Sequence, residues 1–221
     1  DKELVDQIER VKEVVKALNI PIFSVEGFEA DDVIGTLVRL AEKKGVETVI
    51  VTGDRDIMQL VKAKVKVYSP IRGFIEAQLF GEKEVEKLLG IKPKQIIDYK
   101  ALVGDASDNY PGVPGIGPKT AVKLLNEFQT LETIYKNIKK IKPIITHKLI
   151  EGKESAMLSQ KLATIVTNAP VKLDLKACRV HDYDQDKAIE LFQELEFRSL
   201  INKLPGVKEK PKEKNNQIKL F

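Results

Sequence analysis

The sequence predicts an α/β fold, a mostly parallel sheet with flanking helices, followed by a mostly helical region. Two observations predict this order. Up to residue 92, apolar residues at helical spacing alternate with short apolar runs, the pattern of β-α-β units whose parallel strands are buried on both faces. After Pro93 the helical spacing continues almost throughout. We therefore expect an α/β core at residues 1–92, a helical region at 93–204 and a basic flexible tail or linker at 205–221.

Each element of the first region follows from its apolar pattern. One face of a predicted helix at residues 4–18 carries Val5, Ile8, Val11, Val15 and Leu18. Residues 20–25 predict a short strand, residues 32–44 a second helix, and the continuous apolar run 46–51 a second strand. The remaining elements are a short helix at 56–61, strands near 65–68 and 74–76, and a helix at 82–89. In the second region we expect helices at 95–103, 119–128, 131–138, 155–167 and 186–195.

The composition excludes several kinds of site. No apolar run approaches the roughly 20 residues that cross a bilayer, so we expect no membrane partner. The chain starts at Asp1 with neither an initiator Met nor the apolar region of a signal peptide, and we expect a fragment of a cytoplasmic protein. Cys178 is the single cysteine, and His147 and His181 are the two histidines of the sequence. Three such residues are too few for a cysteine-histidine zinc site with four ligands. Any bound metal must be held by oxygen.

Seven carboxylates form the most informative feature of the chain. They occur in three short clusters, which contain Glu29, Asp31 and Asp32, then Asp54 and Asp56, then Asp105 and Asp108. The first two clusters directly follow predicted strands, and ligands of open α/β sheets bind beyond the carboxyl ends of strands. Carboxylates gathered from separate segments repel one another unless cations lie between them. Magnesium prefers a few carboxylates plus phosphate, and a pair of such ions about 3.5 to 4 Å apart can hydrolyse a phosphodiester.

Each cluster taken alone also fits a structural role. Asp31 and Asp32 open a predicted helix, and Asp54 and Asp56 fit a turn with a helix cap. Asp105 and Asp108 could flank a turn. Three such clusters together favour the metal site. The charge balance agrees with it, because Lys and Arg total 37 and Asp and Glu total 33. Setting the seven clustered acids aside leaves 26 acids, an excess of eleven basic residues that suits a polyanionic partner.

A glycine-punctuated hairpin follows the third acidic cluster. Its predicted ligand-binding residues are Gly112, Val113, Gly115, Ile116, Gly117, Lys119 and Thr120. The glycines allow tight turns, and Pro118 suits the first turn of the next helix. Backbone N–H groups at the start of that helix can hold a phosphate, to which Lys119 adds a charge and Thr120 a hydroxyl. A helix connection without any ligand is the alternative. Phosphate contacts predict binding that is independent of sequence and sensitive to salt.

These motifs resemble those of a known family. The strings Glu29–Asp32, Thr52–Asp56, Gly104–Asn109 and Pro111–Ala121 are similar to those of the 5′ nuclease (flap endonuclease) family, most of all to the 5′→3′ exonuclease domain of bacterial DNA polymerase I. The resemblance runs in order from about residue 5 to 204. It implies a PIN-like or resolvase-like core followed by a helix-hairpin-helix (H3TH) motif.

The resemblance also implies an activity and its ligands. Family members hydrolyse phosphodiesters at 5′ flaps, in nicked or gapped duplexes and in RNA primers on DNA, with two ions of Mg²⁺ or Mn²⁺. By this pattern the catalytic metal ligands are Glu29, Asp31, Asp54, Asp56 and Asp108, and Asp32 and Asp105 match further acids of the bacterial members. The segment Gly112 to Lys119 resembles the motif that holds duplex DNA and, through backbone carbonyls, K⁺. A linked polymerase, a cytoplasmic and nucleoid-associated location in a bacterium and a monomeric state are also implied.

One departure from the family pattern shapes the prediction for this chain. Family members begin with a buried strand that bears an essential Asp, and continue with a helical arch; neither precedes Asp1. We therefore expect these 221 residues to bind DNA with impaired cleavage. Two alternatives remain open: a non-catalytic helix-hairpin-helix module that binds duplex DNA, and a metal-dependent RNA nuclease of the same α/β type.

Overall fold

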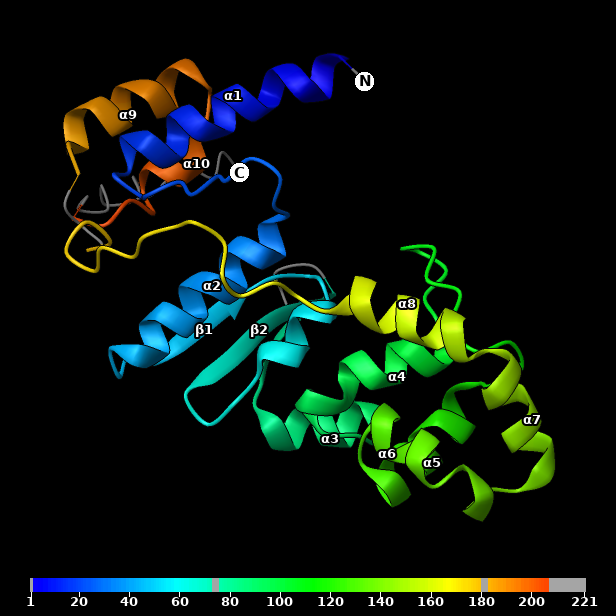
Figure 1. Ribbon diagram of the computed structural model, residues 1–221. Coiled ribbons are helices and arrows are strands. Elements are labelled where there is room, and N and C mark those ends of the chain that lie inside the picture. The colour runs from blue at the N-terminus through cyan, green and yellow to red at the C-terminus, as the bar shows by residue number, and fades with distance from the viewer. Residues whose placement is uncertain (1, 73–75, 180–182, 207–221) are drawn as a thin grey trace, which may run out of the picture. The chain divides into compact units, whose positions relative to one another are not determined.

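The computed structural model describes residues 2–72, 76–179 and 183–206, which form two compact units (Figure 1). One unit comprises residues 24–173. The other joins the chain up to residue 23 with the chain from residue 174 onward. Of the tail predicted at 205–221, residues 207–221 lie outside the described residues. No helix in the described ranges is long and apolar enough to cross a membrane.

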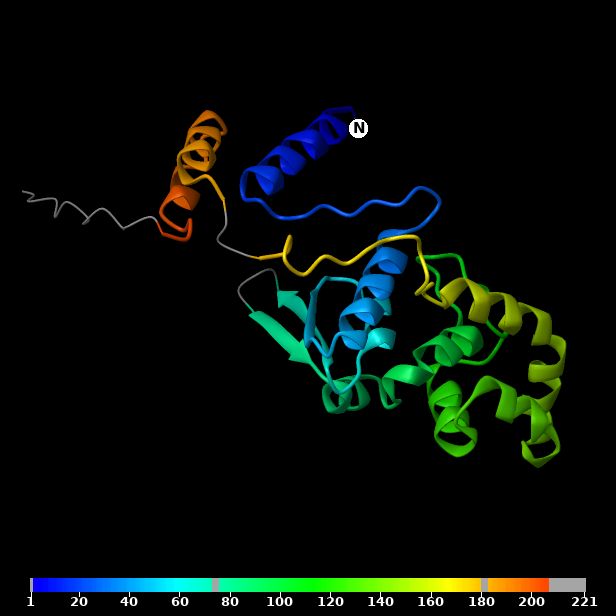
Figure 2. The same cartoon turned by 60° about the vertical axis from the view of Figure 1, so that its left-hand side comes forward.

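A small mixed sheet forms the α/β part of the larger unit. Its strands are β1 (Thr48–Val51), β2 (Val65–Arg72) and β3 (Glu76–Phe80), in the order β1-β2-β3. β1 pairs with β2 in parallel, with Ile50 opposite Val67, whereas β2 and β3 are antiparallel. α2 (Ala30–Lys43) packs against β1, as two views show (Figure 1, Figure 2). The short 3₁₀ helix η1 (Asp56–Leu60) follows β1, and α3 (Glu82–Leu89) follows β3.

The rest of this unit is helical, as predicted. Its elements are η2 (Pro93–Gln95), α4 (Ile96–Val103), α5 (Pro118–Phe128), α6 (Leu131–Lys136), η3 (Ile138–Lys140), α7 (Pro143–Glu151) and α8 (Lys153–Ala163). α4 is central, because it packs against α8, α5 and η1. One apolar core runs through both parts of the unit, from Val65 and Ile57 beneath the sheet to Leu102 and Leu125 among the helices, all with no exposed surface. The acids on η1 and after α4 are therefore carried by one packed body.

A strap of irregular chain after α8 ties the helical part to the α/β part. Gln59 of η1 donates to the Ala163 carbonyl (3.0 Å) and accepts from the Ile165 N–H (3.1 Å). Further along the strap, the Val166 N–H donates to Asp32 Oδ1 at 2.7 Å. The Ala169 N–H donates to the Thr36 hydroxyl, and Arg39 Nε donates to the Thr167 carbonyl. Residues more than 100 positions apart are thus joined along α2 and η1.

The smaller unit contains α1 (Lys2–Ala17), α9 (Gln185–Glu194) and α10 (Arg198–Ile201). Its core consists of Ala188, Phe192 and Leu204, against which Val14 and Leu18 pack. An ion pair of 3.2 Å joins Arg10 to Glu194. The apolar face predicted for the first helix is only partly buried, since Val5, Ile8 and Val11 are exposed.

Several sequence predictions differ from the structure. The strand predicted at 20–25 is wrong: this segment pairs with no strand in the described chain, Ile20 and Ile22 are exposed, and Pro21 offers no N–H. Part of the strand predicted near 74–76 lies outside the described residues, and β3 runs from Glu76 to Phe80. The helix predicted at 155–167 ends at Ala163, where the strap begins. α7 and α10 were not predicted.

Candidate functional site

The first acidic cluster lies at the start of α2. Glu29 is the N-cap residue, and its N–H donates to Asp32 Oδ2 at 3.3 Å. Because the other oxygen of Asp32 accepts the Val166 N–H, Asp32 is committed to structural bonds at both oxygens. Asp31 is half-buried, and burial raises the pKa of its carboxyl; the nearby charges of Asp54, Asp56 and Glu29 add to this shift. The first and second clusters therefore face a common region, although no strand precedes the first among the residues described.

The second cluster is built by the turn that follows β1. The Thr52 hydroxyl accepts from the Asp54 N–H (3.0 Å), and Asp54 Oδ1 accepts from the Asp56 N–H (2.8 Å). These bonds direct Asp56, the first residue of η1, toward the helical part of the unit. Burial raises the pKa of the Asp56 carboxyl, against the opposing effect of the Lys100 ammonium. Asp54 itself is exposed.

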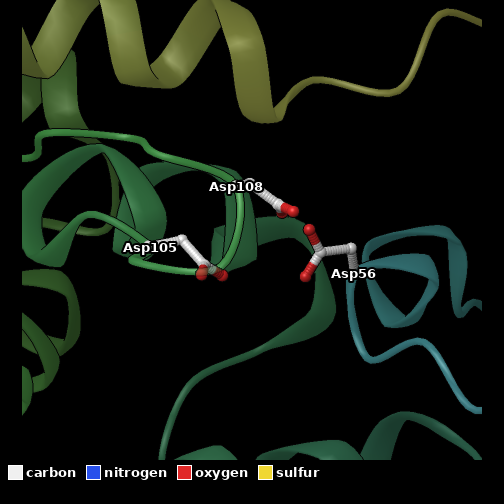
Figure 3. Close-up of side chains that lie close together, drawn as sticks. All are labelled: Asp56, Asp105 and Asp108. Carbon is white, nitrogen blue, oxygen red and sulfur yellow. The ribbon is translucent and has the colours of Figure 1, made fainter.

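The third cluster lies in the loop after α4. Asp105 and Tyr110 form a backbone bridge, with N–H to carbonyl distances of 3.0 and 2.8 Å. Asp105 Oδ1 accepts from the Ser107 N–H at 2.9 Å, while Asp105 Oδ2 lies 2.7 Å from Lys100 Nζ. The Lys100 and Ser107 bonds hold the pKa of the Asp105 carboxyl well below its usual range. Asp108 is more exposed and points into the same region (Figure 3).

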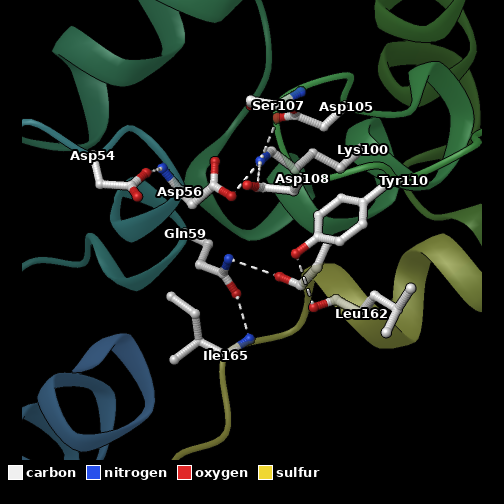
Figure 4. Close-up of polar contacts among 11 residues, drawn as sticks. Asp54, Asp56, Gln59, Lys100, Asp105, Ser107, Asp108, Tyr110, Leu162 and Ile165 are labelled. Carbon is white, nitrogen blue, oxygen red and sulfur yellow. Dashed lines mark hydrogen bonds and ion pairs between the residues drawn. The ribbon is translucent and has the colours of Figure 1, made fainter. Parts of the chain in front are cut away.

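Three carboxylates from two separate segments meet in one group. Asp56, Asp105 and Asp108 each offer an oxygen atom, and these oxygens all lie within 4.8 Å of one another (Figure 3). Lys100 Nζ lies among them and forms ion pairs with Asp56, with Asp105 and, at 3.6 Å, with Asp108 (Figure 4). We call these three acids with Lys100 the acid group. A set of carboxylate oxygens at this spacing is suited to a hard divalent cation.

Sequence reasoning missed Lys100. α4 reads Ile-Ile-Asp-Tyr-Lys-Ala-Leu-Val, and the residues on either side of the lysine pack into the core. Lysine is almost never fully buried unless it is paired, so a lysine inside an apolar helix five residues before Asp105 was a usable signal. In the structure Lys100 is paired with Asp56, Asp105 and Asp108.

The hairpin continues directly from the third cluster. Two hydroxyls of α8 clamp its first glycine: Ser159 accepts from the Gly112 N–H (3.0 Å), and Ser155 donates to the Gly112 carbonyl (2.5 Å). Gly112 has a φ of +61°, which L side chains rarely adopt. The Val113 N–H donates to the Leu102 carbonyl at the end of α4. Thus the hairpin is fixed to α4 and α8 at its base.

The outer part of the hairpin is open to a ligand. Val113 and Ile116 bury their side chains, whereas Gly115, Gly117 and Lys119 are exposed. The N–H groups of Gly115 and Gly117 donate to no acceptor among the described residues. Lys148 Nζ of α7 donates to the Gly115 carbonyl at 3.0 Å, adding a positive charge at the tip. The free N–H groups, Lys119 at the start of α5 and Lys148 of α7 form an arrangement suited to a phosphate. Thr120 is half-buried beside them.

Two family models match the chain, and together they cover residues 1–186. The family model for the 5′-3′ exonuclease N-terminal, resolvase-like domain matches residues 1–90, and the model for the C-terminal SAM fold matches residues 91–186. The chain belongs to this family. The predicted fold class, an α/β core followed by a helical region, is confirmed.

Relatives agree with this family assignment, and solved structures share the fold. The chain is 46% identical over 216 residues to DNA polymerase I of Chloroflexus aurantiacus and 37% identical over 203 residues to that of Bacillus subtilis. These matches cover 95% and 91% of the chain but only 23% of each relative, so the chain spans about a quarter of their length. Among solved structures, a T5 5′-exonuclease mutant matches with a TM-score of 0.58 at 23% identity, covering 80% of this chain and 69% of that one. The catalytic core of Rad2 in complex with DNA matches with a TM-score of 0.61 at 19% identity, covering 95% and 71%.

Proposed function

We propose that the chain is the nuclease part of a larger DNA-processing protein, a 5′→3′ exonuclease and flap endonuclease. Its substrates would be 5′ flaps, nicked or gapped duplexes and RNA primers on DNA. The observation that carries this proposal is the meeting of Asp56, Asp105 and Asp108 beside an exposed hairpin with free N–H groups. The bacterial relatives named DNA polymerase I support a covalently linked polymerase. The protein would act as a monomer in the cytoplasm of a bacterium, at the nucleoid.

The same proposal assigns roles to the parts of the chain. Residues 1–92 would supply the first two acidic clusters, residues 93–204 the third cluster and the hairpin, and residues 205–221 a linker. The two matching family models meet at residues 90 and 91, which supports this division. The three acids of the acid group would hold one divalent cation, Mg²⁺ or Mn²⁺, and Glu29, Asp31 and Asp54 a second, while Asp32 holds the strap beside them.

The donor set fits these ions, because the acid group presents carboxylate oxygens within 4.8 Å and Asp31 is surrounded by further acids. Bound there, the ions would activate a water molecule and stabilise the leaving oxygen of the phosphodiester. One neighbour is described as T5 5′-exonuclease with bound zinc ions, which supports a metal in this fold. The chain's own residues hold the two acids in place: the Ser107 N–H donates to Asp105, and the Asp54 N–H donates to the Thr52 hydroxyl.

The hairpin would hold the duplex by its backbone. The Gly115 and Gly117 N–H groups and Lys119 would contact phosphates, and hairpin carbonyls would accept K⁺. Among the described residues Asp56, Asp105 and Asp108 form the one group of three carboxylates at ligand distance, and the acids of the first cluster form no second such group. This supports the finer proposal that the 221 residues bind DNA and cleave it poorly; fast flap cleavage by the purified chain in Mg²⁺ would contradict it.

Metal titration tests the proposal against its main alternative, a non-catalytic duplex-binding module. We expect Mn²⁺ or Mg²⁺ to raise the melting temperature, because metal binds the folded acids in preference to the unfolded chain. At about 100 times Kd the gain is about 2.7 kcal/mol, or about 5–11 °C for a chain of this size. The same buffer with EDTA and no added metal is the reference. An unchanged melting temperature with intact flap binding would favour the binding module, and preference for single-stranded RNA over flap DNA would favour the RNA nuclease.

Lys119→Ala is expected to weaken flap binding and to reduce its salt dependence. Each phosphate contact contributes about 0.9 to the slope of log K against log salt, so the slope should fall by about that amount. The measurement is fluorescence anisotropy of a labelled flap at several salt concentrations. Lys87→Ala, which removes an exposed lysine from α3, is the matched control. Equal slopes for both variants would remove Lys119 from the DNA contact.

A further inference from the structure

Lys100 occupies an unusual position for a lysine. Only 8% of its surface is exposed, and its ammonium lies among three carboxylates that come from η1 and from the loop after α4. The neighbouring residues Ala101 and Leu102 are fully buried, so the backbone that carries Lys100 is fixed. Its ammonium is therefore a cation built into the acid group.

The ammonium and a divalent cation need the same oxygens. Lys100 Nζ pairs with Oδ2 of Asp56, Oδ2 of Asp105 and Oδ2 of Asp108. A magnesium ion held by these carboxylates would lie about 2.0–2.1 Å from each ligand oxygen. Two cations bound to the same three oxygens repel each other. A metal ion bound to these Oδ2 atoms would therefore compete with the Lys100 ammonium for the acid group.

We propose that Lys100 is an exchangeable positioning residue: its ammonium holds Asp56, Asp105 and Asp108 together in the metal-free protein and leaves them when a divalent cation binds. The inference rests on the proposed metal-dependent function. Without a cation, three carboxylates within 4.8 Å of one another would repel and move apart. Lys100 therefore keeps the acids assembled before metal arrives.

In its present position the ammonium also lies beside an aromatic ring. The centroid of the Tyr110 ring lies 5.5 Å from Lys100 Nζ, within the range of a cation–π interaction. The four-carbon stem of lysine allows the ammonium to swing while the backbone of α4 stays in place. Exchange thus requires a side-chain rotation and no opening of the core.

The exchange predicts effects of opposite sign for one substitution. Lys100→Met removes the charge and keeps the length of the side chain. In EDTA we expect a lower melting temperature, because the three carboxylates lose their counter-ion. For Mn²⁺ we expect a Kd about tenfold lower than that of the unmodified chain, because the metal no longer competes with an ammonium. At saturating Mn²⁺ the difference in melting temperature between the two proteins should shrink.

Calorimetry with Mn²⁺ and thermal melting with and without Mn²⁺ test this. Lys62→Met is the matched control, since Lys62 is a lysine paired with Glu42 on the surface and has no contact with the acid group. Lys100→Arg retains the charge and should restore the metal-free melting temperature without tightening Mn²⁺ binding. Equal destabilisation of Lys100→Met with and without Mn²⁺, or an unchanged or higher Kd, would overturn the inference.

A measurement on the unmodified chain removes any dependence on the folding of the variants. Amine-reactive labelling, read by mass spectrometry, should modify Lys100 at least about fivefold faster with Mn²⁺ than in EDTA, because the ammonium leaves its buried ion pairs. Lys62 should react at the same rate in both conditions. If Mn²⁺ raises the melting temperature but the labelling rate of Lys100 is unchanged, the exchange of Lys100 is overturned and the proposed metal site is retained. No effect of Mn²⁺ on the melting temperature would overturn the proposed metal site as well.

Discussion

Asp54→Asn is expected to lower flap cleavage by the complete protein at least about 10³-fold while flap binding stays within a few fold. The asparagine keeps an oxygen at the position of Oδ1, so it can still accept the Asp56 N–H that Asp54 accepts at 2.8 Å. The local turn should therefore remain, and only the charge is lost. A metal ion supplies several kcal/mol of charge stabilisation to such a reaction, and each 1.36 kcal/mol, approximately, is a factor of ten in rate. Single-turnover cleavage of a labelled 5′ flap measures the effect.

Asp174→Asn is the matched control for Asp54→Asn. Asp174 accepts the N–H of the residue two positions later, Lys176, at 2.8 Å, as Asp54 does with Asp56, but it belongs to the other compact unit. It should leave cleavage unchanged. Retained turnover in Asp54→Asn would remove Asp54 from the catalytic site, and a similar loss in Asp174→Asn would point to a general effect on stability.

Gly112→Ala is expected to destabilise the chain by at least about 3 kcal/mol and to abolish tight flap binding. A non-glycine residue at a φ of +61° is strained by about 1–3 kcal/mol. In addition, a Cβ would lie 2.3 Å from the Gly104 nitrogen and 2.6 Å from the Val103 carbonyl carbon, so backbone must move. The clamp by Ser155 and Ser159 would move with it. The melting temperature should fall by about 6–12 °C or more.

Gly117→Ala, in the same hairpin, provides the comparison. Gly117 has a φ of −96°, and a Cβ added there would meet no heavy atom within 4 Å. Its melting temperature should change by no more than about 2 °C. Thermal melting of both variants, followed by flap-binding titration below the lower midpoint, separates lost stability from lost contact. Equal melting temperatures for the two variants would show that the hairpin base tolerates a side chain.

Local patterns in the sequence predict elements well where one segment decides the outcome. The run at 46–51 contains β1, and the helical spacing at 32–44 matches α2, because each presents an apolar surface to the core. The strand predicted at 20–25 failed because a strand requires a partner, and pairing is not encoded in the strand's own composition. α7 was missed because its apolar residues do not follow one face: Ile144 and Ile150 are exposed while Leu149 is buried.

In the candidate site, too, the sequence predicts local features and misses contacts between distant segments. Carboxylate clustering predicts a common site, and the structure brings Asp56, Asp105 and Asp108 together, with Asp31 near Asp54. The sequence did not distinguish the structural use of Asp32, because its partner Val166 lies 134 residues away. Lys100 was missed for a similar reason, since its ion pair with Asp56 spans 44 residues. Contacts between distant segments are set by the fold as a whole.

The strap after α8 has a consequence for how the molecule comes apart. The strap returns from the helical part and forms hydrogen bonds with Gln59 and Asp32, through Ala163, Ile165 and Val166. These bonds join the end of this unit to its beginning. Thermal unfolding of the body from 24 to 173 should therefore be cooperative, and separating the chain at the junction of its two matched family models would leave each half with unsatisfied bonds. The acid group and the hairpin therefore belong to one folding unit, and we expect neither to fold as an independent module.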